Sequence, residues 1–133
     1  MALTEAEIAY LESQPLGRLA TVAPDGTPQV KPVGFRFDPE LGVFDIGGHA
    51  MAASTKFRNV AAGSRAALVV DDLVSRQPWV VRGMEIRGDA EALSGQDPQR
   101  PGFSGEVIRI HPRRVVSWGI EPGQEGMRGR DYS

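Results

Sequence analysis

The chain carries only two lysines, Lys31 and Lys56, although it carries thirteen arginines. A lysine presents a compact, strongly hydrated ammonium group, whereas an arginine presents a planar fork, so the two are not interchangeable. Lys56 follows the hydroxyl residues Ser54 and Thr55 at the expected start of a short helix. Hydroxyls, free backbone N–H groups and a cation can together hold a phosphate group. We expect an anion site here, and the alternative is an ordinary capped helix with a solvated charge.

The second lysine belongs to the segment Lys31, Pro32, Val33 and Gly34. Proline has no N–H to donate, so this stretch is expected at a sheet edge, or where backbone polar groups face something other than a strand. A planar ring system would fit against such an exposed strand edge. Side chains alternate along a strand, and the sequence leaves open the side to which Lys31 points.

Two tryptophans and one arginine are further candidates. Trp79 and Arg82 are three residues apart, which places them on opposite faces of a regular strand. Trp79 is expected either in the core or as a wall against an aromatic ring, and Arg82 either at the site or as a surface charge. Trp118 is expected in the core or in a contact between subunits.

Composition excludes several kinds of chemistry. The absence of cysteine excludes disulfides, thiolate metal sites and thiol nucleophiles. His49 and His111 have no acidic companion at ligand spacing, so no metal site is expected. A formal net charge of −2 without runs of like charge does not indicate nucleic-acid binding. The acidic start and the lack of an apolar run of about eighteen residues favour a cytoplasmic protein with no membrane contact.

Most of the elements that position these residues are expected to be strands. Thr4 and Glu7 form a capping-box pattern for a helix at 4–13, and a second short helix is expected at 52–62. Glycines at 83 and 88 would allow a long strand to bend or bulge. Strands are expected at 18–23, 29–37, 43–47, 65–71, 79–93, 106–110 and 115–120, with the first three forming a meander, a loop at 94–104 and a connection at 111–114.

This pattern predicts a mainly β protein, a small antiparallel barrel of six or seven strands with short helices. The length of 133 residues suits one domain, and we place it at 1–120. Residues 121–133 are polar and rich in glycine, so they are expected to be a disordered tail or an arm lying on a partner.

Several motifs, taken in order, resemble a known family. They are Leu-x-x-Leu-Ala-Thr-Val-x-x-Asp-Gly-x-Pro at 16–28, Pro-Val-Gly-Phe at 32–35, Thr-Lys-x-x-Asn-Val at 55–60 and Arg-Ile-His-Pro-Arg-Arg-Val-x-x-Trp-Gly-Ile at 109–120. The chain thus resembles the pyridoxamine 5′-phosphate oxidase-like superfamily, an FMN-binding-like split β-barrel. More narrowly, it is similar to the branch of coenzyme F420-dependent (deazaflavin) reductases.

The resemblance implies a homodimer with the cofactor in a cleft between subunits, and hydride transfer to a small molecule that the sequence does not identify. The cofactor-binding positions it implies are Lys31, Pro32, Val33 and Gly34 along the ring, Ser54, Thr55, Lys56 and Asn59 around the phosphate, and Trp79 and Arg82 as walls or tail contacts. No acid–base pair is visible, as expected where the cofactor carries the chemistry.

Alternatives remain open at this point. They are an FMN-binding oxidoreductase, a carrier of flavin or deazaflavin without turnover, and, more distantly, a haem-degrading protein. Oxidation of vitamin B6 is disfavoured, because the arginine-containing substrate motif of the oxidase branch has no match after residue 120.

Overall fold

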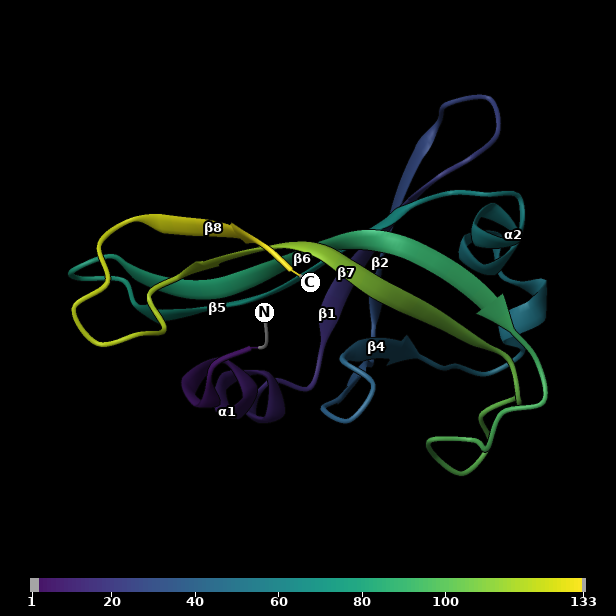
Figure 1. The fold of residues 1–133 in the computed structure, drawn as a ribbon, viewed down its shortest axis with the longest axis horizontal. Coiled ribbons are helices and arrows are strands. Elements are labelled where there is room, and N and C mark those ends of the chain that lie inside the picture. Colours follow the sequence, from purple (N-terminus) through teal and green to yellow (C-terminus); the bar gives the residue numbers. More distant parts are fainter. Residues whose placement is uncertain (1–2, 133) are drawn as a thin grey trace.

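A computed structural model describes residues 3–132 as one strongly curled antiparallel sheet with two α-helices (Figure 1). The helices lie toward opposite ends of the sheet, so α1 and α2 contact different parts of it. The elements are α1 (Glu5–Ser13), β1 (Gly17–Val22), β2 (Pro28–Val33), β3 (Arg36–Asp38), β4 (Val43–Ile46), the 3₁₀ turn η1 (Met51–Ala53), α2 (Thr55–Ala61), β5 (Ala66–Ser75), β6 (Val80–Leu93), β7 (Val107–Trp118) and β8 (Met127–Asp131).

The strand order explains how the sheet closes. The path is β2-β1-β5-β6-β7-β4-β3, with β8 added on β7. Strands β2 and β3 are consecutive in the chain but lie at the two ends of this path, and only Gly34 and Phe35 connect them. No hydrogen-bonded ladder joins β2 to β3, and the two ends of the sheet are connected only by the two residues of the chain between these strands. This gap in the ladder confirms the predicted split barrel. The predicted meander was wrong, because residues 29–37 form two strands with different partners.

Strand β7 runs without interruption from Val107 to Trp118, so the predicted connection at 111–114 was also wrong. Arg87 pairs with Arg114 while Gly88 pairs with Pro112, and Arg113 is left as an extra residue. This β-bulge accommodates Pro112, which has no N–H for the ladder. Gly88 is required beside it, because a Cβ there would overlap the carbonyl oxygen of His111.

The capping box at the start of α1 is confirmed. The Glu7 N–H donates to Thr4 Oγ1 at 3.1 Å, and the Thr4 N–H donates to Glu7 Oε1 at 2.9 Å. The Glu7 carboxylate also accepts from both terminal nitrogens of Arg130, which belongs to β8. The C-terminal segment is thus not a disordered tail over residues 127–131: it forms a strand that pairs with β7 and is held to α1 by a buried ion pair.

The core lies inside the curl, where side chains from β4 to β7 meet. Fully buried members include Phe44, Ile46, Leu68, Met84, Ile86, Ile108 and Ile110. Helix α2 packs against β1 and β6. No helix in the range 3–132 is long and apolar enough to cross a bilayer.

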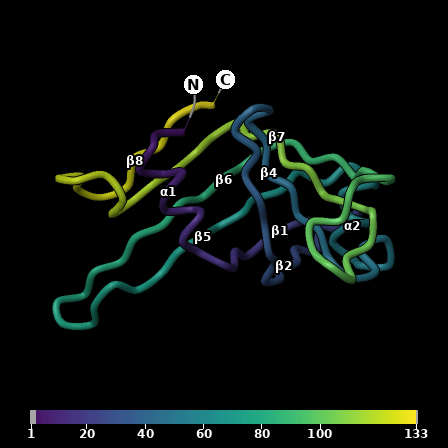
Figure 2. The backbone as a smooth tube through the Cα atoms, turned by 90° about the horizontal axis from the view of Figure 1, so that it is seen from below, coloured from purple at the N-terminus to yellow at the C-terminus, as the bar shows by residue number. Residues whose placement is uncertain are grey.

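The β5–β6 hairpin extends beyond the rest of the molecule (Figure 2). This arm, residues 73–81, exposes a group of large apolar side chains: Leu73, Val74, Trp79, Val80 and Val81. Trp79 is 69% exposed, so of the two alternatives for this residue, packing in the core of its own chain is excluded.

Candidate functional site

The strand register determines the side to which Lys31 points. Lys31 lies directly opposite Leu19, and directly opposed residues of an antiparallel pair share a face of the sheet. Leu19 is 1% exposed and belongs to the core. Lys31 therefore lies on the concave face, at the edge strand β2, and its ammonium group extends from the core layer toward solvent.

Lys56 lies in the first turn of α2, and Ser54 is the N-cap of this helix as predicted. The Ser54 hydroxyl accepts from the Phe57 N–H at 3.2 Å and donates to the Met51 carbonyl oxygen at 2.6 Å. It orients the helix start in this way. Thr55 follows as an exposed residue, with its hydroxyl 3.5 Å from the Arg58 guanidinium.

Lys31 is close enough to Lys56 to influence the charge of Lys56. Burial lowers the pKa of Lys56 below its ordinary value, and Coulomb repulsion from Lys31 lowers it further. Neither lysine forms an ion pair with any residue between 3 and 132. Two neighbouring ammonium groups without a carboxylate form a site that an anion would stabilise. We call Lys31 and Lys56 the lysine pair.

Asn59 anchors α2. Its side chain is buried, and its Nδ2 donates to the equally buried Thr21 Oγ1 of β1 at 3.1 Å. The contact fixes the helix against the sheet, and Lys56 lies one turn earlier on the same helix. Asn59 thus fixes the position of α2, and with it the position of Lys56, relative to the sheet.

The segment after Lys31 presents a mixed surface. Val33 is buried opposite Gly17, whereas Pro32 is exposed opposite Arg18 on the convex face. As predicted, the segment lies at one end of the sheet, so β2 pairs with β1 alone. A Cβ added at Gly34 would meet no atom within 4 Å, so the backbone just beyond β2 is open to close approach.

Trp79 is not near the lysine pair within this chain. Lys31 pairs with Leu19, which in turn pairs with Leu68 of β5, whereas Trp79 lies in the turn that follows Ser75 at the end of β5. The seven residue steps from Leu68 to Ser75 span about 23 Å of extended strand. If Trp79 forms a wall of the cofactor site, it does so at a site in another copy of the chain.

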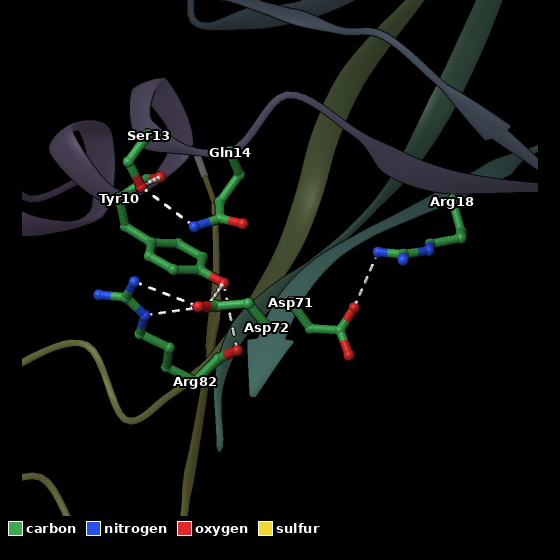
Figure 3. Close-up of polar contacts among 7 residues, drawn as sticks. All are labelled: Tyr10, Ser13, Gln14, Arg18, Asp71, Asp72 and Arg82. Carbon is green, nitrogen blue, oxygen red and sulfur yellow. Dashed lines mark hydrogen bonds and ion pairs between the residues drawn. The ribbon is translucent and has the colours of Figure 1, made fainter. Parts of the chain in front are cut away.

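Arg82 has its own partners, Asp72 of β5 and Tyr10 of α1 (Figure 3). Its guanidinium donates to both carboxylate oxygens of Asp72, at 2.9 and 3.2 Å, and lies 5.0 Å from the centre of the Tyr10 ring. The Tyr10 hydroxyl donates to the same carboxylate at 2.7 Å. The hydrogen bonds from Arg82 lower the pKa of Asp72, whose carboxylate therefore stays ionised. This cluster attaches α1 to β5 and β6.

A hollow between α1 and β3 was not anticipated from the sequence. Its volume is about 800 Å³, and its wall includes Ile8, Leu11, Phe35, Arg36, Phe37 and Arg100. A smaller hollow of about 150 Å³ shares three of its residues, Phe35, Arg36 and Arg100, and reaches Gly34. The alternation of aromatic residues with an arginine in Phe35-Arg36-Phe37 was the available signal. It was missed because these residues were placed in one regular strand.

The curled antiparallel sheet with its split between β2 and β3 defines the class of split β-barrel proteins. The family model described as pyridoxamine 5′-phosphate oxidase matches residues 3–121, and the chain belongs to this family. The chain is 50% identical over 135 residues to the 5a,11a-dehydrotetracycline/5a,11a-dehydrooxytetracycline reductase of Streptomyces rimosus, a match that covers 100% of this chain and 95% of the relative. Together these matches support an oxidoreductase of this family.

Solved structures share the fold at low sequence identity. A heme binding protein from Mycobacterium smegmatis superposes with a TM-score of 0.69 at 19% identity, over 98% of this chain and 59% of that one. General Stress Protein 26 from Bacillus anthracis gives a TM-score of 0.64 at 16% identity, over 88% and 94% of the two chains. At these identities the likeness establishes the fold alone.

Proposed function

We propose that this chain is a coenzyme F420-dependent oxidoreductase that transfers a hydride between the deazaflavin and a small-molecule acceptor. The observation that carries the proposal is the lysine pair, two ammonium groups that repel each other and have no carboxylate partner in the described part of the chain. Anchoring of the phosphate of the cofactor would supply the missing negative charge.

The residues around the lysine pair fit such a cofactor. Lys31 and Lys56 would neutralise the phosphate, and Ser54 and Asn59 hold α2 so that Lys56 stays beside β2. The open backbone at Gly34 leaves room for a ring to lie beside the end of the strand. The protein thereby contributes position and electrostatics, while the deazaflavin supplies the hydride when it is bound.

The reductive direction is supported by the name of the relative that is 50% identical. A dehydro compound contains a carbon–carbon double bond that a reductase converts into a single bond. One carbon would receive the hydride with its electron pair and the other a proton from water, while the reduced deazaflavin becomes oxidised. We propose an acceptor of this class, a conjugated double bond in a polycyclic molecule.

We also propose that the active form is a homodimer. The exposed apolar side chains of the arm, residues 73–81, would be covered by a second copy, because patches of this kind mark interaction surfaces. In such a dimer, the arm of one copy would also bring its Trp79 to the cofactor site of the other copy, which Trp79 does not reach within a single chain.

FMN is the second candidate cofactor, because its terminal phosphate would meet the same lysine pair. Titration of the protein with F420 and with FMN, followed by quenching of the emission of Trp79 and Trp118, separates the two. We expect F420 to bind at least tenfold more tightly, a difference of about 1.4 kcal/mol. If FMN binds tenfold more tightly, a flavoprotein replaces the deazaflavin proposal. If F420 binds but no acceptor is ever reduced, the protein is a carrier.

Replacement of Lys56 tests the lysine pair directly. Charge-assisted hydrogen bonds contribute about 1.5–3 kcal/mol each, so Lys56→Ala should weaken F420 binding roughly ten- to a hundredfold. Arg18→Ala is the matched control, because Arg18 pairs with Asp71 on the convex face. Unchanged affinity in Lys56→Ala, with thermal unfolding like that of the wild type, would make Lys56 an ordinary solvated charge.

A further inference from the structure

We propose that the hollow between α1 and β3 is the acceptor site, and that Arg36 and Arg100 select a planar, polycyclic anion there. The role as acceptor site depends on the proposed function. The chemistry of the ligand does not, because it follows from the walls of the hollow.

The size and the walls of the hollow favour a flat apolar molecule. Its volume of about 800 Å³ falls in the range of small-molecule sites. Phe37 comes from β3 and Phe35 directly precedes this strand, while Ile8 and Leu11 come from α1, so apolar surfaces from both sides line the space. Aromatic rings bind other planar rings by stacking or by edge-to-face contact.

Two arginines give the hollow a positive charge. Neither Arg36 nor Arg100 forms an ion pair within residues 3–132. Asp45 lies opposite Arg36 on β4, but its carboxylate already accepts two hydrogen bonds from Arg109, at 2.8 and 3.0 Å. Glu12 is the carboxylate on the wall of the hollow itself. With one carboxylate and two guanidinium groups, the wall of the hollow carries a net positive charge. A carboxylate or an enolate of the ligand would neutralise this charge.

The smaller hollow joins this site to the expected position of the ring. It extends from Arg36 and Arg100 to Gly34, where the backbone is open. Arg100 lies in the loop between β6 and β7, and this loop is fastened to the segment before α2. The Ser104 N–H donates to the Gly48 carbonyl oxygen at 2.9 Å, and the Met51 N–H donates to Ser104 Oγ at 3.1 Å. One set of contacts thus holds both the arginine loop and the helix that carries Lys56.

The experiment uses a matched pair of three-ring probes, anthraquinone-2-carboxylate and its neutral carboxamide. Their binding to the full chain is measured by titration calorimetry without added cofactor. We expect the carboxylate to bind the wild type at least tenfold more tightly than the carboxamide. The double variant Arg36→Gln/Arg100→Gln should lose this preference. Arg128→Gln, which removes an exposed charge from β8 that forms no ion pair within residues 3–132, is the control and should keep it.

Cofactor binding separates this inference from the proposed function. The Arg36→Gln/Arg100→Gln variant should bind F420 as the wild type does, whereas Lys56→Ala should keep the carboxylate preference and lose F420. Equal binding of the two probes by the wild type, or loss of the preference in Lys56→Ala but not in the arginine variant, would overturn the inference. If the wild type shows the preference but does not bind F420, the proposed function fails and the anion site survives.

Discussion

The anion site proposed at Lys31 and Lys56 would lower the stability of the protein when it is empty. The pKa of Lys56 is lowered by burial and by the charge of Lys31, so in the absence of an anion the charged pair disfavours the folded state. Sites of this kind are commonly retained because the ligand restores what the repulsion removes.

Lys31→Gln should therefore have opposite effects on stability and on binding. Loss of the repulsion should raise the Tm of the protein without cofactor by about 1–3 °C, a few tenths of a kcal/mol. The affinity for F420 should fall at the same time, because one phosphate contact is lost. Differential scanning calorimetry and fluorescence titration measure the two quantities. A fall in both the Tm and the affinity for F420 would show that Lys31 stabilises the fold and is not a ligand-binding residue that lowers stability.

At the scale of single elements, the bulge in β6 and β7 has a precise steric requirement. A Cβ at residue 88 would overlap the carbonyl oxygen of His111, which belongs to the paired backbone and cannot move aside. Gly88→Ala should lower the free energy of unfolding by about 3 kcal/mol, the upper end of the usual cost of overpacking, because the overlap is with backbone. Gly34→Ala is the control, because nothing lies within 4 Å of its added Cβ. Urea unfolding of the two variants compares them, and equal stability would contradict the assigned bulge.

The contact of α1 with β8 should make the protein sensitive to acid. Burial raises the pKa of Glu7, but the hydrogen bonds from Arg130 and from the Thr4 N–H outweigh it, so the pKa is held below its ordinary value of 4.5. A carboxyl whose pKa is lowered by folding contributes stability above its ordinary pKa, and this contribution is lost as the pH falls through the lower, folded value.

Glu7→Gln should cost about 3–5 kcal/mol at neutral pH, because it leaves the Arg130 guanidinium largely buried without its counter-charge. The dependence of stability on pH should also become flatter below about pH 4.5. Glu5→Gln, at an exposed position in the same helical turn, is the control. Chemical unfolding between pH 3 and 7 measures both effects. An unchanged pH profile would show that Glu7 is not the group that titrates.

At the scale of the whole molecule, the arm predicts how two copies associate. The homodimer should bury well over the ~1,000 Å² expected of a specific interface. Sedimentation equilibrium should give twice the chain mass of 14.4 kDa at micromolar concentration. The double substitution Val74→Arg/Trp79→Arg should yield monomers, whereas Leu41→Arg, at an exposed apolar residue of the β3–β4 turn, should not. A wild-type mass near 14 kDa would end the proposal.

Local sequence determined much of this fold. The Thr4 and Glu7 capping box, the turn between β1 and β2, the Ser54 cap and the glycine at the bulge each depend on residues close to one another in the chain. The motif order was sufficient to indicate the family, and the two lysines were identified from their rarity and from the hydroxyls beside Lys56. Propensity and capping are short-range effects, and a single sequence displays them directly.

The tertiary structure decided what depends on partners distant in sequence. The register of β1 and β2 placed Lys31 on the concave face, and the separate pairing of β2 and β3 left these strands connected only by Gly34 and Phe35. The ion pair of Glu7 with Arg130 joins residues 123 positions apart. It holds in place a C-terminal segment whose polar, glycine-rich composition predicts disorder. Arg36 and Arg100 likewise meet in one hollow only after folding. Long-range strand pairing and charge compensation depend on the whole chain at once, so no local pattern could have revealed them.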